Sequence, residues 1–231
     1  MSIIEQLAHI QSQIHRAEKQ YHRAPGSVQL LAVSKQQPIE KIRAAIEGGQ
    51  TCFGENYLQE ALAKIAALQN SDRSDFQPIK WHFIGKIQSN KTGQIAEHFD
   101  WVHSIDRLNI AERLNAQRPQ HLAPLNICIE INIHQENTKS GIELTALPAL
   151  AHAISRLKQI RLRGLMAIPR PALDFETQLE TYQQVQKAQH MLCTQGLMLD
   201  TLSMGMSGDF IAAIAAGSTL VRVGSAIFGR R

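Results

Sequence analysis

Eight short apolar runs recur along the chain, and stretches whose apolar residues have helical spacing separate them. The runs occupy residues 29–35, 51–57, 81–86, 101–106, 125–133, 162–168, 201–207 and 220–229. Strands that alternate with helices predict a parallel sheet. Eight such units in 231 residues predict a closed (β/α)₈ TIM barrel, for which about 250 residues is typical. An open doubly wound sheet is the alternative, but no GxGxxG motif follows the first predicted strand.

The first 24 residues precede this pattern and predict an additional helix. Ile3, Leu7, Ile10 and Ile14 repeat at the spacing of an amphipathic helix. The segment has no continuous apolar core and no small-residue cleavage site, so we do not expect a signal peptide. We expect residues 1–231 to form a single domain, with the N-terminal helix packed on the barrel.

Composition restricts the classes of function. Apolar residues make up 44% of the chain and charged residues 19%, which is typical of a globular protein. The net charge of +4 comes from dispersed basic residues, and aromatic residues are only 5%, so we expect no nucleic-acid partner. The most apolar stretch, residues 211–228, is interrupted by Arg222 and by small polar residues, which argues against a membrane span.

The cysteines and histidines indicate neither a disulfide framework nor a metal site. The three cysteines lie far apart without a CxxC pair, which suggests free thiols and a cytoplasmic location. The ten histidines include no HExxH or HxH pair, so we expect no metal.

Lys35 ends the first predicted strand and is the first candidate for chemistry. It shares a strand face with Leu31 and Val33, which directs its side chain toward the carboxyl-terminal mouth of the barrel. A partly desolvated lysine has a lowered pKa and becomes a nucleophile for carbonyl groups. The alternative is a lysine that extends into solvent at a strand end.

Arg222 lies in the last predicted strand, on one face with Leu220 and Gly224. A buried guanidinium needs a partner, because an unpaired buried charge costs several kcal/mol. That partner is either an acceptor on a ligand or a carboxylate, for which Glu130 on the fifth predicted strand is a candidate.

Small residues gather after the last two predicted strands, where barrels often bind phosphate. Gly224 and Ser225 follow Arg222 directly, and the segment 203–209 (SMGMSGD) precedes a helical run. Exposed backbone amides in such loops favour an anion, although tight turns also use these residues. We expect Asp209 to be a helix N-cap.

A Schiff-base lysine, an inward-facing arginine and a phosphate site together suggest pyridoxal 5′-phosphate (PLP). From about Leu30 to Gly229 the chain closely resembles the YggS/PROSC family of PLP homeostasis proteins, which is related to the barrel domain of alanine racemase. The matching blocks are LLAVSK, FGENYLQE, WHFIGKIQSNK, INIHQENTKSG, LRGLMAIP and SMGMSGDFIAAIAAGSTLVRVGSAIFG. The resemblance implies a fold-type III PLP protein.

The resemblance also implies roles for individual residues. Lys35 would hold PLP as a Schiff base, and Arg222 would face the pyridine nitrogen. The residues implied beside the ring are Asn56, His82, Ile84 and Met166, and those implied at the phosphate are Ser203, Ser207, Gly224 and Ser225. Lys139 is either a second PLP acceptor or a solvated loop lysine.

The function implied is intracellular PLP (vitamin B6) homeostasis without an established catalytic turnover. PLP-dependent apo-enzymes would be recipients of the coenzyme, and we expect a monomer. A PLP-dependent amino-acid racemase of low activity is the alternative, and a PLP-free Schiff-base aldolase is a third reading. Three positions depart from the family pattern: Gln36 and Gln37 replace a threonine and a lysine, and Gly208 replaces a frequent acidic residue.

Overall fold

The computed structural model describes residues 1–69, 78–134 and 140–229. Its eight strands pair in sequence order, all parallel, and β8 pairs with β1 to close the barrel. The predicted (β/α)₈ barrel is therefore confirmed. The strands are β1 (Gln29–Val33), β2 (Cys52–Glu55), β3 (Lys80–Phe83), β4 (Trp101–Ile105), β5 (Leu125–Ile131), β6 (Ile160–Ala167), β7 (Thr201–Ser203) and β8 (Leu220–Val223).

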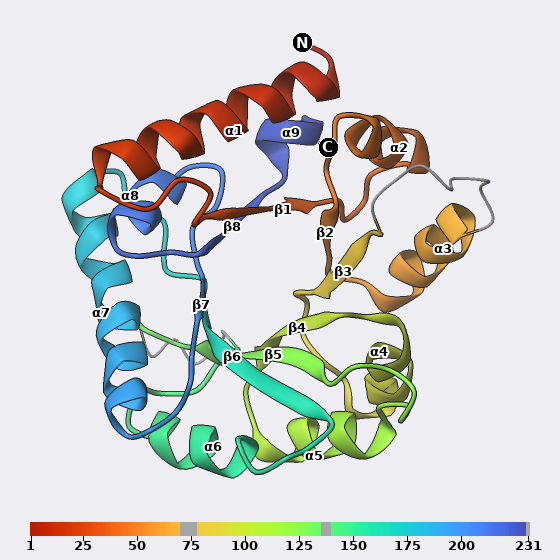
Figure 1. Ribbon diagram of the computed structural model, residues 1–231, viewed down its shortest axis with the longest axis vertical. Coiled ribbons are helices and arrows are strands. Elements are labelled where there is room, and N and C mark those ends of the chain that lie inside the picture. Colours follow the sequence, from red (N-terminus) through yellow and green to blue (C-terminus); the bar gives the residue numbers. More distant parts are fainter. Residues whose placement is uncertain (70–77, 135–139, 230–231) are drawn as a thin grey trace.

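The helices form a ring around the strands (Figure 1). They are α1 (Ile3–Gln20), α2 (Ile39–Glu47), α3 (Leu58–Gln69), a 3₁₀ turn η1 (Ser89–Lys91), α4 (Thr92–His98), α5 (Leu108–Gln117), α6 (Leu147–Ile154), α7 (Phe175–Thr194), α8 (Phe210–Ala215) and α9 (Ser225–Phe228). Across the described residues, no helix has both the length and the apolar character needed to cross a membrane.

Most of the strands end before the predicted apolar runs do, and the last two are shortened most. The run 201–207 is a strand only to Ser203, because Gly205 adopts a left-handed φ of 95° and turns the chain toward α8. The run 220–229 is a strand only to Val223 and then becomes the short helix α9. Apolar side chains continue through both turns, which is why the pattern alone did not show the ends. Both ends leave small polar residues at the barrel mouth.

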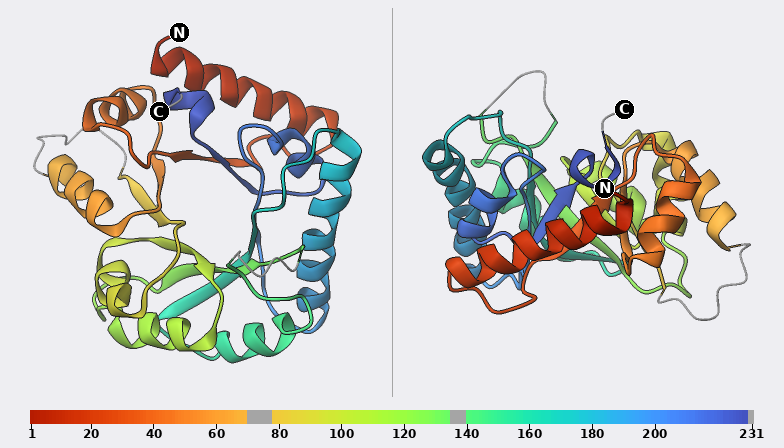
Figure 2. Two further views of the ribbon diagram at one scale, coloured as in Figure 1. Left: turned by 180° about the vertical axis from the view of Figure 1, so that it is seen from behind. Right: turned by 90° about the horizontal axis from the view of Figure 1, so that it is seen from above.

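The N-terminal helix α1 lies across the outside of the barrel against α2, α8 and α9 (Figure 2). It begins with a capping box, in which the Ser2 side chain accepts from Glu5 N and the Glu5 side chain accepts from Ser2 N. Leu7, Ile10 and Ile14 are buried, as their spacing predicts.

The two faces of the strands have different environments. On β5, Ile127, Ile129 and Ile131 point outward into the main apolar core beneath the helices. Cys128 points inward and packs with Trp101 and Met166 inside the barrel. A second inward cluster contains Leu31, Cys52 and Leu220, with Ile84 against it. The inside of the barrel is thus filled with side chains, as expected for this fold.

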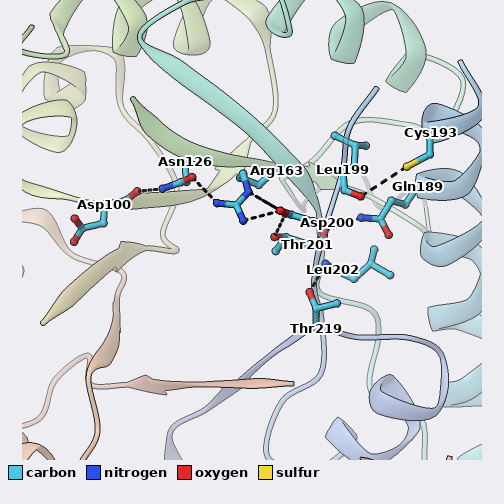
Figure 3. Close-up of polar contacts among 10 residues, drawn as sticks. All are labelled: Asp100, Asn126, Arg163, Gln189, Cys193, Leu199, Asp200, Thr201, Leu202 and Thr219. Atoms are coloured by element: carbon cyan, nitrogen blue, oxygen red, sulfur yellow. Dashed lines mark hydrogen bonds and ion pairs between the residues drawn. The ribbon is translucent and has the colours of Figure 1, made fainter. Parts of the chain in front are cut away.

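Charged and hydrogen-bonding side chains close the amino-terminal end of the barrel (Figure 3). The Arg163 guanidinium binds both carboxylate oxygens of Asp200, at 2.7 to 3.1 Å, and donates to Asn126 Oδ1 at 2.8 Å. It also lies over the Trp101 ring, 4.9 Å from the centroid. A cavity of about 460 Å³ opens there, and Arg163 and Asp200 on its wall already satisfy one another. We therefore interpret the amino-terminal end of the barrel as a stabilising face.

Strands β6 and β7 approach each other closely at Gly164 on β6. A β-carbon at this position would overlap the backbone carbonyl oxygen of Thr201 on β7. We expect Gly164→Ala to lower the free energy of unfolding by at least about 2 kcal/mol, because backbone must move. Urea unfolding measures this. Gly93→Ala is the control, since in helix α4 its β-carbon would meet nothing closer than 3.7 Å. Equal unfolding midpoints for the two variants would contradict the close approach.

Candidate functional site

A cavity of about 320 Å³ lies at the carboxyl-terminal ends of the strands, within the size range of small-molecule sites. It gathers most of the predicted site residues from positions far apart in the sequence. Its walls contain Lys35, Asn56, Ile84, Ser207, Arg222, Gly224 and Ser225, together with Val33, Ile168, Met206 and Gly208. Of the predicted residues, His82, Met166 and Ser203 do not line it and are buried in the barrel beneath. Lys139 falls outside the described residues.

Lys35 stands in a tight turn that follows β1. Ser34 N donates to Gly54 O on β2, and Gln37 N donates back to Ser34 O at 3.1 Å. The turn places the half-buried Lys35 side chain on the cavity wall, as its position after an inward-facing strand predicts. Gln37 is buried and accepts from Lys41 Nζ at 3.0 Å, so this departure from the family pattern does not face open solvent.

Arg222 is only 4% exposed, yet no carboxylate in the described part of the chain forms an ion pair with it. Its Nη1 donates to Ser203 Oγ at 2.8 Å and to Ser203 O, and its Nη2 donates to Ala167 O at 2.9 Å. Burial lowers the pKa of Arg222 from its usual value. The alternative of an Arg222–Glu130 ion pair is therefore not found, and the cavity wall carries an arginine bound only by neutral acceptors.

A chain of buried side chains continues from Arg222 into the barrel. Ser203 Oγ lies 2.8 Å from His103 Nδ1, and His103 Nε2 lies 2.9 Å from His82 Nδ1. The His82 ring stacks on Trp101 at 5.4 Å. Burial, with a smaller effect of Lys80, lowers the pKa of His82 to about 3. The pKa of His103 is also well below its usual value, mainly through burial.

His82 and His103 are therefore neutral and hold Ser203 beneath Arg222. His82 supports the cavity from below, one layer under its wall. His103 was not among the predicted site residues. Its position two residues after Trp101, on the same inward strand face, was the available signal.

The small residues after β7 and β8 meet on one side of the cavity. Ser225 Oγ donates to Ser207 Oγ at 3.3 Å, and a β-carbon at Gly208 would meet nothing within 4 Å. Asp209 stands at the N-cap position of α8, but its carboxylate does not cap that helix. It accepts instead from Met206 N at 2.6 Å and from Tyr182 Oη at 2.9 Å. The Asp209 carboxylate therefore does not form the expected N-cap hydrogen bond and instead stabilises the loop that contains Ser207.

The donors and acceptors on the wall fit PLP. Asn56 Oδ1 is buried without a hydrogen-bond partner, so it is an acceptor that a bound molecule can satisfy. Arg222 supplies a cation without a paired carboxylate, and the serine hydroxyls supply donors for a phosphate. Lys35 supplies an amine on the same wall. In the described residues, no group of three or more His, Cys, Asp or Glu could hold a metal ion.

Comparison with known proteins agrees with this site. A family model described as the alanine racemase N-terminal domain matches residues 6–231. Two curated relatives, each named pyridoxal phosphate homeostasis protein, come from Vibrio alginolyticus and Escherichia coli (strain K12). Both are 51% identical to this chain, over 100% and 99% of its length and 98% and 97% of theirs. The chain belongs to the alanine racemase N-terminal domain family, among the pyridoxal phosphate homeostasis proteins.

Solved structures that are similar to this chain agree with the family assignment. PipY of Synechococcus elongatus PCC7942 is 38% identical and has been solved without PLP and with PLP bound, at TM-scores of 0.86 and 0.85. The alignments cover 99% of this chain and 100% of PipY. Alanine racemase from Corynebacterium glutamicum, at 15% identity and a TM-score of 0.70, shares the fold, and the match covers 64% of its length. The family resemblance in the sequence is confirmed.

Glu130 gives this family member a testable pH dependence. Burial, and then Asp106, raise the pKa of Glu130 to about 7 from 4.5, against the opposing effects of Arg222 and Lys86. A raised pKa means that the folded state binds the proton more tightly. Its stabilisation is complete below about pH 4.5 and is lost as the pH rises through about 7.

Between about pH 5 and pH 8, the wild type should therefore lose on the order of 2 kcal/mol of unfolding free energy that Glu130→Gln does not lose. Urea unfolding across a pH series measures the difference. Parallel stability curves for the two proteins would show that Glu130 titrates normally.

Proposed function

We propose that this protein binds PLP through Lys35 and serves PLP homeostasis by holding the coenzyme and releasing it. The observation that carries the proposal is that Lys35 and an arginine without a carboxylate partner, Arg222, line the same cavity. The names of the relatives and the PLP-bound structure of PipY support the choice of ligand.

The chemistry of holding and release follows from the amine. PLP supplies a reactive aldehyde. The Lys35 amine attacks the carbonyl carbon, a C=N bond forms, and the carbonyl oxygen leaves as water. Attack by a second amine at the same carbon would pass the C=N bond to that amine and free Lys35, and attack by water would return the free aldehyde, so the linkage suits storage and exchange.

Arg222 suits a site that holds PLP. A guanidinium donates hydrogen bonds and keeps its proton, so a ring nitrogen that faces it stays unprotonated. An unprotonated ring withdraws electrons weakly and stabilises a carbanion poorly. This property of the site suits a carrier, which needs no strong electron sink.

The other predicted residues take supporting places in this proposal. Asn56 and Ile84 would lie beside the ring, and Ser207, Gly224 and Ser225 would receive the phosphate. Those in the layer beneath, His82, Met166 and Ser203, would hold the floor of the site rather than contact PLP through the open cavity.

We further propose that residues 1–231 act as one PLP-binding unit, monomeric and cytoplasmic, which delivers PLP to apo-enzymes. The family model matches residues 6–231, which supports one unit. Cys52, Cys128 and Cys193 are free, which supports a reducing compartment. Lys139 stays a proposed second acceptor.

The test is covalent labelling. Incubation with PLP should give a yellow absorption band, and borohydride reduction followed by peptide mapping should place the pyridoxyl mass on Lys35. In Lys35→Ala the total pyridoxyl label on the protein should fall at least about tenfold at limiting PLP, because the nucleophile is gone. Lys80→Ala, an exposed lysine at the opposite end of the barrel, is the control and should label as the wild type does. A wild type that takes no label would refute the proposal.

Carrier function and turnover are separated by two further measurements. If delivery is direct, PLP-loaded protein should still activate a PLP-dependent apo-enzyme when a trap that captures free PLP is present. Amino acids incubated with loaded protein in heavy water should show no more deuterium at Cα than with Lys35→Ala. Exchange well above that background would favour the racemase alternative.

A further inference from the structure

The turn that carries Lys35 is held by a buried lysine from the neighbouring helix. Lys64 on α3 has only 8% of its side chain exposed, and its Nζ donates to the carbonyl oxygen of Ser34 at 2.7 Å. The same ammonium binds Glu55 Oε1 at 2.8 Å and Glu60 Oε1 at 2.5 Å. One cation therefore joins the residue before Lys35 to two carboxylates on β2 and α3.

The residue after Lys35 is held by the same cluster. Gln36 adopts a left-handed φ of 57°, which is uncommon for a residue with a side chain and costs roughly 1–2 kcal/mol. Its backbone N–H donates to Glu60 Oε1 at 2.5 Å, and Lys64 binds the same oxygen. Such a backbone outlier persists only where its surroundings fix it.

The side chain of Ser34 completes the arrangement. Ser34 Oγ donates to Glu55 Oε1 at 2.6 Å, so backbone and side chain of this residue both contact the cluster. Glu55 is fully buried, and its second oxygen, Oε2, has no hydrogen-bond partner. Burial raises the pKa of Glu55, while hydrogen bonds from Lys64 and Ser34 oppose the rise. Without Lys64, this carboxylate would be left as an uncompensated buried charge.

We propose that Lys64, through Glu55 and Glu60, is a positioning residue that fixes the backbone on both sides of Lys35 so that its amine faces the cavity. The inference rests on the proposed PLP attachment and adds a residue that does not touch the ligand. A buried ion pair is weak evidence for stability alone, because apolar side chains of similar volume often replace one at little cost. A misplacement of about 1 Å at a reacting group costs roughly a hundredfold in rate.

The experiment compares attachment rate with stability. PLP is mixed with wild type, Lys64→Met and Lys64→Arg in the absence of denaturant, and the rise of the imine absorption band gives the rate. Lys64→Met should attach PLP at least about tenfold more slowly, and Lys64→Arg should recover part of the rate by restoring the charge. Arg163→Met is the matched control, because it removes a cation from an ion pair at the opposite end of the same barrel. It should lower the urea midpoint and leave the attachment rate unchanged.

Glu60→Ala keeps the inference testable if Lys64→Met does not fold. Glu60 is partly exposed, and its removal frees the Gln36 amide while the Lys64–Glu55 pair stays intact. We expect a lower attachment rate with nearly unchanged stability. Wild-type attachment rates in the folded Lys64 and Glu60 variants would overturn the positioning role. Absence of attachment in the wild type would instead refute the proposed function itself.

Discussion

The charge of Arg222 inside the barrel is the constraint on which the candidate site depends. The guanidinium extends from β8 and binds carbonyl oxygens on β6 and β7, so it ties three neighbouring strands together. Because its protein partners are neutral, a cation without a paired carboxylate remains on the wall of the cavity. His103 and His82, kept neutral by burial, support Ser203 below it without adding charge. The barrel thus holds the Arg222 cation where a ligand acceptor can reach it.

The arginines at the two ends of the barrel have different partners. This difference distinguishes the stabilising end from the end that carries the candidate site. Arg163 at the amino-terminal end is satisfied by Asp200, Asn126 and the Trp101 ring. The cavity beside it is larger than the one at Lys35, yet its charged groups are already paired. Volume alone would favour that end. The carboxyl-terminal mouth instead has Asn56 Oδ1, a buried acceptor without a hydrogen-bond partner, and Arg222, a cation without a paired carboxylate.

The barrel and the inward-facing positions of Lys35 and Arg222 could be predicted because they follow from local pattern, whereas the roles of these two residues at PLP were implied only by the family resemblance. The alternation of strands and helices predicts the fold, and period-two alternation places Lys35 and Arg222 on inward faces. The ends of β7 and β8 were wrong, since apolar side chains continue past Ser203 and Val223 into turns. The contacts of Lys64 with Ser34 and Glu55 could not be predicted, because they join residues 30 and 9 positions apart only after folding.

Holding a reactive aldehyde reversibly needs an amine that is well placed but a site that does not drive later chemistry. The turn at Lys35 meets the first need: its neighbour Gln36 is held in a costly backbone conformation by Glu60, so the amine is oriented before a ligand arrives. In the proposed function, Arg222 would meet the second, because a guanidinium that keeps its proton cannot give one to a ring nitrogen that faces it. Both properties come from charges fixed in the apo protein. In the proposed function, the fixed turn at Lys35 would favour attachment, and exchange with a second amine would release the coenzyme.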